Sequence, residues 1–203
     1  ANYAVGYNNI DLAAAKRRGL IVTNTPDVLT DAAADLTWAL LLATARRIVE
    51  GDGLVRSGHW IGWSPTQLLG AEISGKTLGI IGMGRIGQAV ARRAIGFRMS
   101  VLYHTRQATP LSSLPREWEY RPLRELLEEA DVVTIHVPLT PATHHLIGTC
   151  ELGWMRPTAF LINTARGPIV NEAALVNALK REAIAGAGLD VYEEEPTLHP
   201  DLA

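Results

Sequence analysis

The stretch GMGRIG, residues 82–87, constrains the fold of this 203-residue chain more than any other. It follows the apolar run TLGII directly, and the residues after it, up to Ile95, read as a helix. Glycines at this spacing permit a tight turn, a close approach of the backbone to a pyrophosphate, and close packing of helix on strand. We therefore interpret the loop as a dinucleotide-binding loop formed by Gly82, Gly84, Arg85, Ile86 and Gly87. A glycine-rich turn needed only for packing is the alternative.

Strands and helices alternate along the rest of the chain. The apolar runs that we expect as strands are SVLYH, DVVTIHV, residues 159–163 and AGAGLDV, and the expected helices cover residues 122–130 and 172–181. Continuous apolar strands separated by helices indicate a parallel sheet covered on both faces. The predicted fold is α/β, a doubly wound parallel sheet of the Rossmann type.

The first 76 residues differ from this rhythm. Residues 11–18 read as a short helix, residues 21–23 as a strand, and Thr30 as the N-cap of a long helix. Residues 57–76, which are rich in Gly, Ser, Pro and Trp, read as a loop. We expect residues 1–25 to be the edge of one domain and residues 26–203 to be the dinucleotide-binding domain, in a chain cut at both ends.

Composition excludes some partners and favours others. A net charge of −2 gives no reason to expect nucleic acid. The most apolar region, residues 31–49, has an uncharged stretch shorter than the roughly 20 residues that span a bilayer, so we expect no membrane association. A helix that is apolar nearly all round is buried either in a core or in a subunit interface; we favour partial burial by a second copy, hence a homodimer through residues 31–50. Cys150 is the only cysteine, which favours a reducing compartment, the cytoplasm.

The strand after the glycine loop ends in YHTR. An NAD site usually has an acidic residue there, which accepts hydrogen bonds from the ribose hydroxyls. This chain has His104, Thr105 and Arg106 instead, and an arginine can hold a 2′-phosphate through charge-assisted hydrogen bonds. NADP(H) is therefore the expected cofactor and NAD(H) the possible one, with a solvated Arg106 as the alternative.

Several motifs together resemble the D-isomer-specific 2-hydroxyacid dehydrogenase family, and within it glyoxylate/hydroxypyruvate reductases most closely. The matching stretches include VGYNNIDLAAAKRRGLIVTNTP, LTDAAADLTWALLLATARR, GKTLGIIGMGRIGQAVARR, HVPLTPATHHLI, INTARGPIVNEAALVNAL and AGAGLDVYEEEP. They cover nearly the whole chain in the family's order. The resemblance implies that residues 1–25 are the edge of a flavodoxin-like substrate domain.

The resemblance also assigns roles to residues. Arg166, where an apolar run meets Gly-Pro, is implied to bind the 2-oxo acid, and a guanidinium fork suits a carboxylate. Glu195, directly before a proline, is implied to pair with a catalytic histidine, whereas we expect Glu193 and Glu194 to face solvent. Val5 and Gly6 are implied to bind the substrate carboxylate; the remaining implied cofactor contacts are Thr30, Val137, Pro138, Thr143, Thr164, Ala165 and Asp190. No metal site is expected.

The expected proton donor is a histidine in a Pro-His-(Ile/Thr)-Gly segment. None of the six histidines, at positions 59, 104, 136, 144, 145 and 199, lies in such a segment. His136, inside an apolar strand, reads as a core histidine with satisfied hydrogen bonds. We expect the acid to lie outside this chain, which should bind NADPH but be nearly inactive alone.

The function implied by the resemblance is NADP(H)-dependent reduction of glyoxylate or hydroxypyruvate to a D-2-hydroxy acid. Other acids on the same scaffold remain open, including D-lactate-like acids, phosphoglycerate and phosphite, with NAD(H) as cofactor. So does a non-enzymatic corepressor of the same family that senses dinucleotides.

Overall fold

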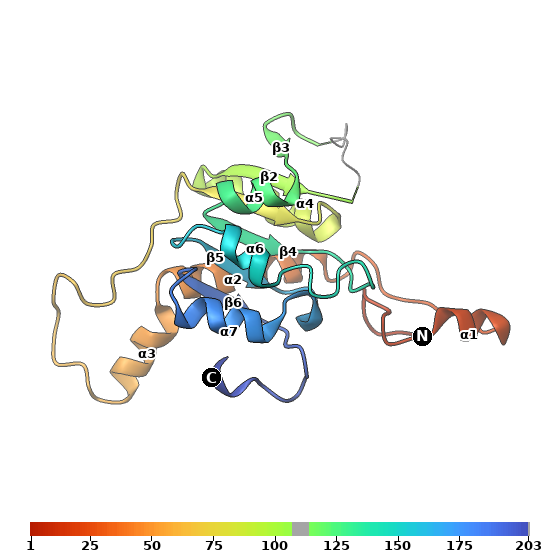
Figure 1. Cartoon of the computed structure of the whole chain (residues 1–203), viewed down its shortest axis with the longest axis horizontal. Helices are drawn as coiled ribbons and strands as arrows, with labels where there is room; N and C mark the ends of the chain where they lie inside the picture. The colour runs from red at the N-terminus through yellow and green to blue at the C-terminus, as the bar shows by residue number, and fades with distance from the viewer. Residues whose placement is uncertain (107–113, 203) are drawn as a thin grey trace.

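The computed structural model describes residues 1–106 and 114–202, and its centre is one six-stranded parallel sheet (Figure 1). The strands lie in the order β3-β2-β1-β4-β5-β6, and every neighbouring pair is parallel. This is the order of a doubly wound dinucleotide-binding sheet, so the predicted fold class is confirmed. The strands are β1 Thr77–Ile81, β2 Ser100–His104, β3 Trp118–Tyr120, β4 Val132–Ile135, β5 Phe160–Asn163 and β6 Gly186–Leu189.

Helices cover both faces of the sheet. One apolar cluster joins α2 and α4 to the sheet, and a second joins α5, α6 and α7 to the opposite face. Figure 1 shows α5, α6 and α7 in front of the strands and α1 projecting away from them. The helices are α1 Leu12–Arg17, α2 Thr30–Ala45, α3 Ile48–Arg56, α4 Arg85–Ala94, α5 Leu123–Glu129, α6 Thr149–Trp154 and α7 Glu172–Lys180, with short 3-10 turns at Ile95–Phe97, Gly167–Ile169 and Pro200–Leu202.

The contact of α2 with α4 shows how the apolar region is used. Trp38 stacks on Phe97 with 4.7 Å between ring centroids, and its indole Nε1 donates to the carbonyl of Val90 at 3.1 Å. Leu41 is fully buried, which contributes about 1.5–3 kcal/mol for such a side chain. The inner face of α2 is therefore buried by this chain's own core. None of the helices in the described residues is long and apolar enough to cross a membrane.

Three expectations about local structure were wrong. Residues 21–23 form no strand, because they find no sheet to join; their neighbourhood makes only isolated backbone bonds, such as Asn2 N to Thr23 O. Thr30 is the first residue of α2 and not its N-cap, a position taken by Leu29 without a side-chain cap. The long apolar helix ends at Ala45, and Arg47 in the left-handed conformation (φ 54°) starts α3 in a new direction.

Two elements were missed. The strand β3 has only three residues and the helix α6 only six, too few to show a hydrophobic period. The other predicted strands and helices are confirmed, with ends that differ by one or two residues. Residues 57–76 contain no helix or strand, as expected.

Candidate functional site

The carboxyl ends of the strands bring the predicted residues to one edge of the sheet. Gly82 follows β1, His104 ends β2, Val137 closely follows β4, Thr164 follows β5 and Asp190 follows β6. The strand order reverses between β1 and β4, and ligands of doubly wound sheets bind in the crevice outside that switch point. The parallel topology therefore collects residues that are far apart in sequence.

Each glycine of the loop meets a different spatial demand. Gly82 has φ +100°, and a Cβ there would lie 2.6 Å from the carbonyl oxygen of His136. A Cβ on Gly87 would lie 2.1 Å from the carbonyl oxygen of Gly82, so only glycine lets α4 start this close to β1. Gly84, by contrast, has no atom within 4 Å of its Cβ position. The open space at Gly84, beside the free amides at the start of α4, fits a dinucleotide pyrophosphate.

The starts of α2 and α4 lie next to each other at this loop. Arg85 pairs with Asp27 at 2.6 Å, and both side chains are mostly exposed, so the ion pair adds little stability. The amide of Thr30 donates to the carbonyl of Asp27 at 3.1 Å. Ile86 packs half-buried against the core. The cofactor contacts predicted for Thr30, Arg85 and Ile86 remain predictions.

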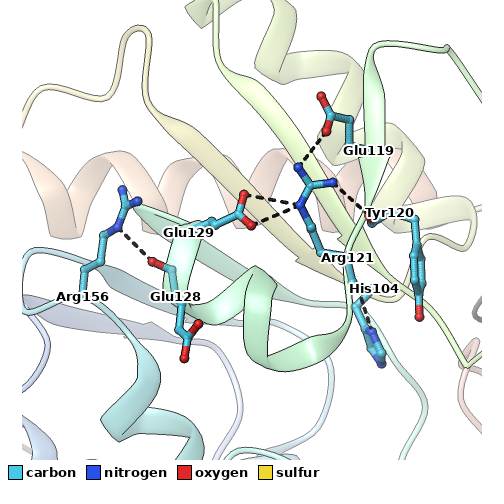
Figure 2. A network of polar contacts seen from close by, with 7 residues as sticks. All are labelled: His104, Glu119, Tyr120, Arg121, Glu128, Glu129 and Arg156. Carbon is cyan, nitrogen blue, oxygen red and sulfur yellow. Dashed lines mark hydrogen bonds and ion pairs between the residues drawn. The ribbon is translucent and has the colours of Figure 1, made fainter.

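The end of β2 is held by the neighbouring strand (Figure 2). His104 Nδ1 lies 3.1 Å from the backbone carbonyl of Arg121, and the ring stacks loosely on Tyr120. The Arg121 guanidinium in turn binds the carboxylates of Glu119 and Glu129 at 2.8 and 3.1 Å. A carbonyl only accepts, so Nδ1 carries the proton and Nε2 is left as the acceptor of a neutral ring. Thr105 is half-buried and Arg106 is exposed. Only Thr105 separates Arg106 from the end of β2, so no acidic residue stands between them in the sequence.

The loop after β4 is braced by its own hydroxyls. Thr143 Oγ1 donates to the carbonyl of Pro138 at 2.6 Å and accepts from the amide of Thr140 at 2.8 Å. The side chain of Val137 lies 2.9 Å from the Cβ position of Gly82, which brings this loop against the glycine loop. Val137 and Pro138 are thus placed beside the proposed cofactor site, whereas Thr143 shapes the loop.

A buried asparagine builds the turn that carries Arg166. Asn163, the last residue of β5, donates through Nδ2 to the carbonyl of Arg166 and accepts at Oδ1 from the amide of Ala165, both at 3.0 Å. The hydroxyl of Thr164 lies 2.9 Å from that of Thr37 on α2. These bonds replace the strand ladder and turn the chain sharply, so that the arginine side chain leaves the sheet edge in one fixed direction.

Arg166 faces the N-terminal segment. Its Nε donates to Asn8 Oδ1 at 3.0 Å, and its Nη1 donates to the carbonyl of Ala165 at 2.6 Å. Its Nη2 lies 2.0 Å from the position that a Cβ on Gly6 would take. The guanidinium is therefore packed between two segments of the chain, not spread over an outer surface, and its role in substrate binding remains a prediction.

Side-chain amides order the segment that meets Arg166. Asn2 Nδ2 donates to the carbonyl of Gly6 at 2.7 Å, and Asn24 Nδ2 donates to the carbonyl of Val5 at 2.9 Å. No hydrogen bond from the amide of Val5 or Gly6 is found among the described residues, so these two donors could bind a carboxylate.

Two acidic groups lie together after β6. Partial burial, and after it the negative charge of Glu195, raise the pKa of Asp190 above its usual value. Glu195 is exposed, and its Oε1 accepts a hydrogen bond from the amide of Tyr192 at 2.8 Å. Glu195 is therefore presented on the outside of a tight turn, where a partner from another part of a protein can reach it.

The expectation that Glu193 faces solvent was wrong. Its carboxylate is half-buried; Oε1 contacts Nε2 of His145, and Oε2 accepts from the amide of Glu172 at 3.0 Å. Burial alone would raise the pKa of Glu193, but the hydrogen bond from Glu172 and the contact with His145 outweigh it and hold that pKa below its usual value. Glu194 is exposed, as expected.

Three of these groups are close enough to consider a metal. Within the described residues, one group of this kind was found: His144, His145 and Glu193, with potential ligand atoms all within 4.8 Å of one another. Asn171 Nδ2 lies 3.3 Å from His145 Nδ1, and Asn171 Oδ1 is already occupied by the amide of Ala174. Nδ1 of His145 must therefore accept, and the proton sits on Nε2, facing Glu193. With Nε2–H directed at Glu193, the three side chains form a hydrogen-bond cluster, and a metal would have to displace that proton in order to bind.

A sequence profile described as the D-isomer specific 2-hydroxyacid dehydrogenase, NAD binding domain, matches residues 38–202. The chain belongs to this family. It is 57% identical over 206 residues to a glyoxylate reductase of Thermococcus gammatolerans, with all of this chain and 62% of that protein covered.

Solved structures of the family agree with this result. A glyoxylate reductase from Paecilomyes thermophila superposes with a TM-score of 0.90 at 39% identity, covering 100% of this chain and 62% of the other. An NADPH-dependent glyoxylate/hydroxypyruvate reductase from Sinorhizobium meliloti, solved with NADP and malonate, gives a TM-score of 0.87 at 42% identity and covers 99% and 62%. The chain thus spans about three fifths of the length of the relatives it matches.

Reasoning from the sequence missed several residues that build the site: Thr37, His145, Asn163, Glu172 and the buried role of Glu193. Asn163 alone had a local signal, because a polar residue at the end of an apolar strand needs a partner for its amide.

Proposed function

We propose that this chain is the cofactor-binding part of an NADP(H)-dependent reductase that converts glyoxylate or hydroxypyruvate to the D-2-hydroxy acid. The observation that carries the proposal is the position of Arg166. It leaves the same sheet edge as the glycine loop and packs against Gly6, so an acid held by the guanidinium would lie beside a cofactor bound in the crevice. The names of the relatives support the choice of acid.

Each predicted site residue then has its own role in the reaction. Arg166 binds the carboxylate and carbonyl oxygens of the 2-oxo acid through its planar fork and favours negative charge on the carbonyl oxygen. The free amides of Val5 and Gly6 hold the other side of the carboxylate. The bound nicotinamide supplies the hydride. Glu195 is exposed and lies beside Asp190. It orients a histidine from outside these residues and stabilises the protonated form of that histidine, which then donates the proton.

The preference for NADP(H) rests on the end of β2. Arg106 is exposed, and the sequence from His104 to Ser113 contains no acidic residue, so Arg106 can pair with a 2′-phosphate. His104, held by the Arg121 carbonyl, presents Nε2 as an acceptor for a ribose hydroxyl. Neither residue excludes NAD(H), which we expect to bind more weakly than NADP(H).

Calorimetric titration with NADPH and NADH in one buffer tests this cofactor preference. We expect tighter binding of NADPH, and an Arg106→Ala variant that loses about tenfold or more in NADPH affinity while NADH affinity stays within about twofold. Equal affinities in the wild type would refute the preference and favour an NAD(H)-dependent dehydrogenase. A longer protein that binds dinucleotide but reduces neither glyoxylate nor hydroxypyruvate would favour the corepressor class. We expect the 203-residue chain alone to reduce almost no glyoxylate.

We also propose a homodimer, in the cytoplasm. The surface from α3 to the following loop exposes an apolar group whose members are Ile48, Val49, Val55, Trp60, Ile61, Trp63 and Leu69. This group continues the region expected to be covered by a second copy and extends beyond residue 50, whereas the inner face of α2 is buried in the chain's own core. Sedimentation equilibrium should give a dimer for the wild type and a monomer for a Trp60→Glu/Trp63→Glu variant; a monomeric wild type would refute the proposal.

A further inference from the structure

A partly buried hydrogen-bonded cluster lies beside the turn that carries Arg166. We call His145, Glu172 and Glu193 the His145 cluster. Glu193 contacts His145 Nε2 through one carboxylate oxygen and accepts from the amide of Glu172 at 3.0 Å through the other. Its own amide donates back to Glu172 Oε1, and Glu172 is a buried residue at the start of α7. The backbone N–H of Glu193 and both of its carboxylate oxygens thus form hydrogen bonds within the cluster.

The His145 cluster holds both segments that carry the predicted catalytic side chains. The amide of His145 donates to the carbonyl of Pro168 at 2.8 Å, two residues after Arg166. A Cβ on Gly167 would lie 1.8 Å from the carbonyl oxygen of Tyr192, so the Arg166 turn rests directly on the backbone next to Glu193. Glu195 is bonded to the amide of the same Tyr192. One rigid unit therefore connects the turn of Arg166 to the turn of Glu195.

The ring of His145 is held through both of its nitrogens. The backbone φ of His145 is 51°, in the left-handed region, which glycine adopts more easily than any other residue. Asn171 donates to Nδ1, and this fixes the tautomer in which Nε2–H points at Glu193. The neighbouring ring of His144 lies 4.0 Å away but is exposed and has no hydrogen bond to the cluster among the described contacts. Six described non-glycine residues, His145 among them, have a positive φ; what distinguishes His145 is that both of its ring nitrogens have a partner in or beside the cluster.

We propose that the His145 cluster sets the distance and angle between Arg166 and Glu195, which makes His145 and Glu193 positioning residues for substrate binding and proton transfer. This inference rests on the proposed function, because it assigns the roles of Arg166 and Glu195. It extends that function to two residues that touch neither substrate nor cofactor.

Two substitutions at His145 separate positioning from folding. His145→Gly removes the ring and also relieves the left-handed backbone, so the protein should stay folded and be at least as stable as the wild type. His145→Gln keeps the backbone strain but retains an N–H donor near the Nε2 position for Glu193. His144→Ala is the matched control, since it removes the adjacent exposed ring and leaves the cluster intact.

Catalytic activity should depend on whether residue 145 donates a hydrogen bond to Glu193, whereas the free energy of unfolding should depend on the backbone conformation at residue 145. In the full-length reductase, kcat/KM for glyoxylate should fall at least tenfold in His145→Gly, fall less than threefold in His145→Gln, and stay unchanged in His144→Ala. The dissociation constant for NADPH should stay within twofold in all three, because the glycine loop is not part of the cluster. A folded glycine variant as active as the wild type would overturn the proposal, and so would a folded glutamine variant that loses as much activity as the glycine variant.

An NMR measurement on the 203-residue chain tests the cluster without turnover. The Nε–H signal of Arg166, hydrogen-bonded to Asn8, should shift or broaden in His145→Gly and remain in place in His144→Ala. An unmoved signal in the glycine variant would overturn the positioning role even if the full-length reductase is active; a shifted signal together with a full-length wild-type protein that reduces neither glyoxylate nor hydroxypyruvate would instead refute the proposed function. Tight Zn²⁺ binding lost in His144→Ala would show a metal site in place of the cluster.

Discussion

Acidification should destabilise this protein through one buried histidine, His136. Within residues 1–106 and 114–202 its Nε2 is buried and has no hydrogen-bond partner, so the expectation of a satisfied core histidine was wrong at this atom. Burial lowers the pKa of His136 from 6.5 to about 4. The folded protein thus keeps the ring neutral at a pH at which the unfolded chain has already taken up a proton.

The sign and size of the effect follow from these two values. Between pH 6.5 and about 4 the unfolded state binds more protons than the folded state, so stability rises with pH and is lost as the pH falls through this window. The complete difference corresponds to about 3 kcal/mol, of which about 2 kcal/mol is lost between pH 7 and pH 5. This is a large share of the about 5–15 kcal/mol that holds a typical domain folded.

Urea denaturation at pH 7 and pH 5 measures this loss in the wild type and in His136→Gln. The glutamine keeps a polar side chain that cannot take up a proton, whereas all other groups titrate as before, so the difference between the two proteins isolates His136. The free energy of unfolding should fall by about 2 kcal/mol more in the wild type than in the variant. His59→Gln, at an exposed histidine, should behave like the wild type. Equal losses in the wild type and in His136→Gln would refute the reasoning.

The other predictions concern the glycines and the acidic pair. Gly87→Ala should lower the free energy of unfolding by about 1–3 kcal/mol because its Cβ meets backbone, whereas Gly84→Ala should lower it by less than about 1 kcal/mol and mainly weaken NADPH binding. Urea denaturation measures the first effect and calorimetric titration with NADPH the second. Equal losses of stability in the two variants would contradict the geometry. Gly6→Ala should leave stability within about 0.5 kcal/mol and reduce kcat/KM for glyoxylate about tenfold, since the displaced neighbour is a flexible guanidinium; unchanged kinetics would argue against that arginine as substrate ligand. Glu195→Gln should lower the pKa of Asp190 in a carbon-detected NMR titration by removing the nearby charge, and an unchanged value would leave burial as the sole cause.

The layered sheet could be predicted because its signals are local. The central strands β1 and β4 are short apolar runs, each followed by a helix, and the glycine loop has the strand before it and the helix after it. Such patterns depend on neighbours in sequence, and parallel crossovers have one hand, so few arrangements remain. The prediction failed where a segment is too short to show a period, as in β3, or has no sheet to join, as in residues 21–23.

The candidate site was predicted in its residue types but not in its contacts. The motif around Arg166 marked it as an anion-binding residue, yet nothing nearby in sequence indicated that it would pack against Gly6. The three adjacent glutamates 193–195 differ only in direction, because the turn after β6 points Glu193 inward and the next two outward. Direction in an irregular turn depends on the partners that it meets.

The sequence by itself determined the doubly wound sheet and its phosphate loop, since glycine spacing and apolar periodicity act within one strand–turn–helix unit. Only the tertiary structure decided which side chains act together: Asn8 with Arg166, and His145 with Glu193. These partners are far apart along the chain, and they meet because the parallel crossovers return each strand end to the same edge of the sheet. Hydrogen bonds form at that edge according to distances and directions that no local pattern encodes.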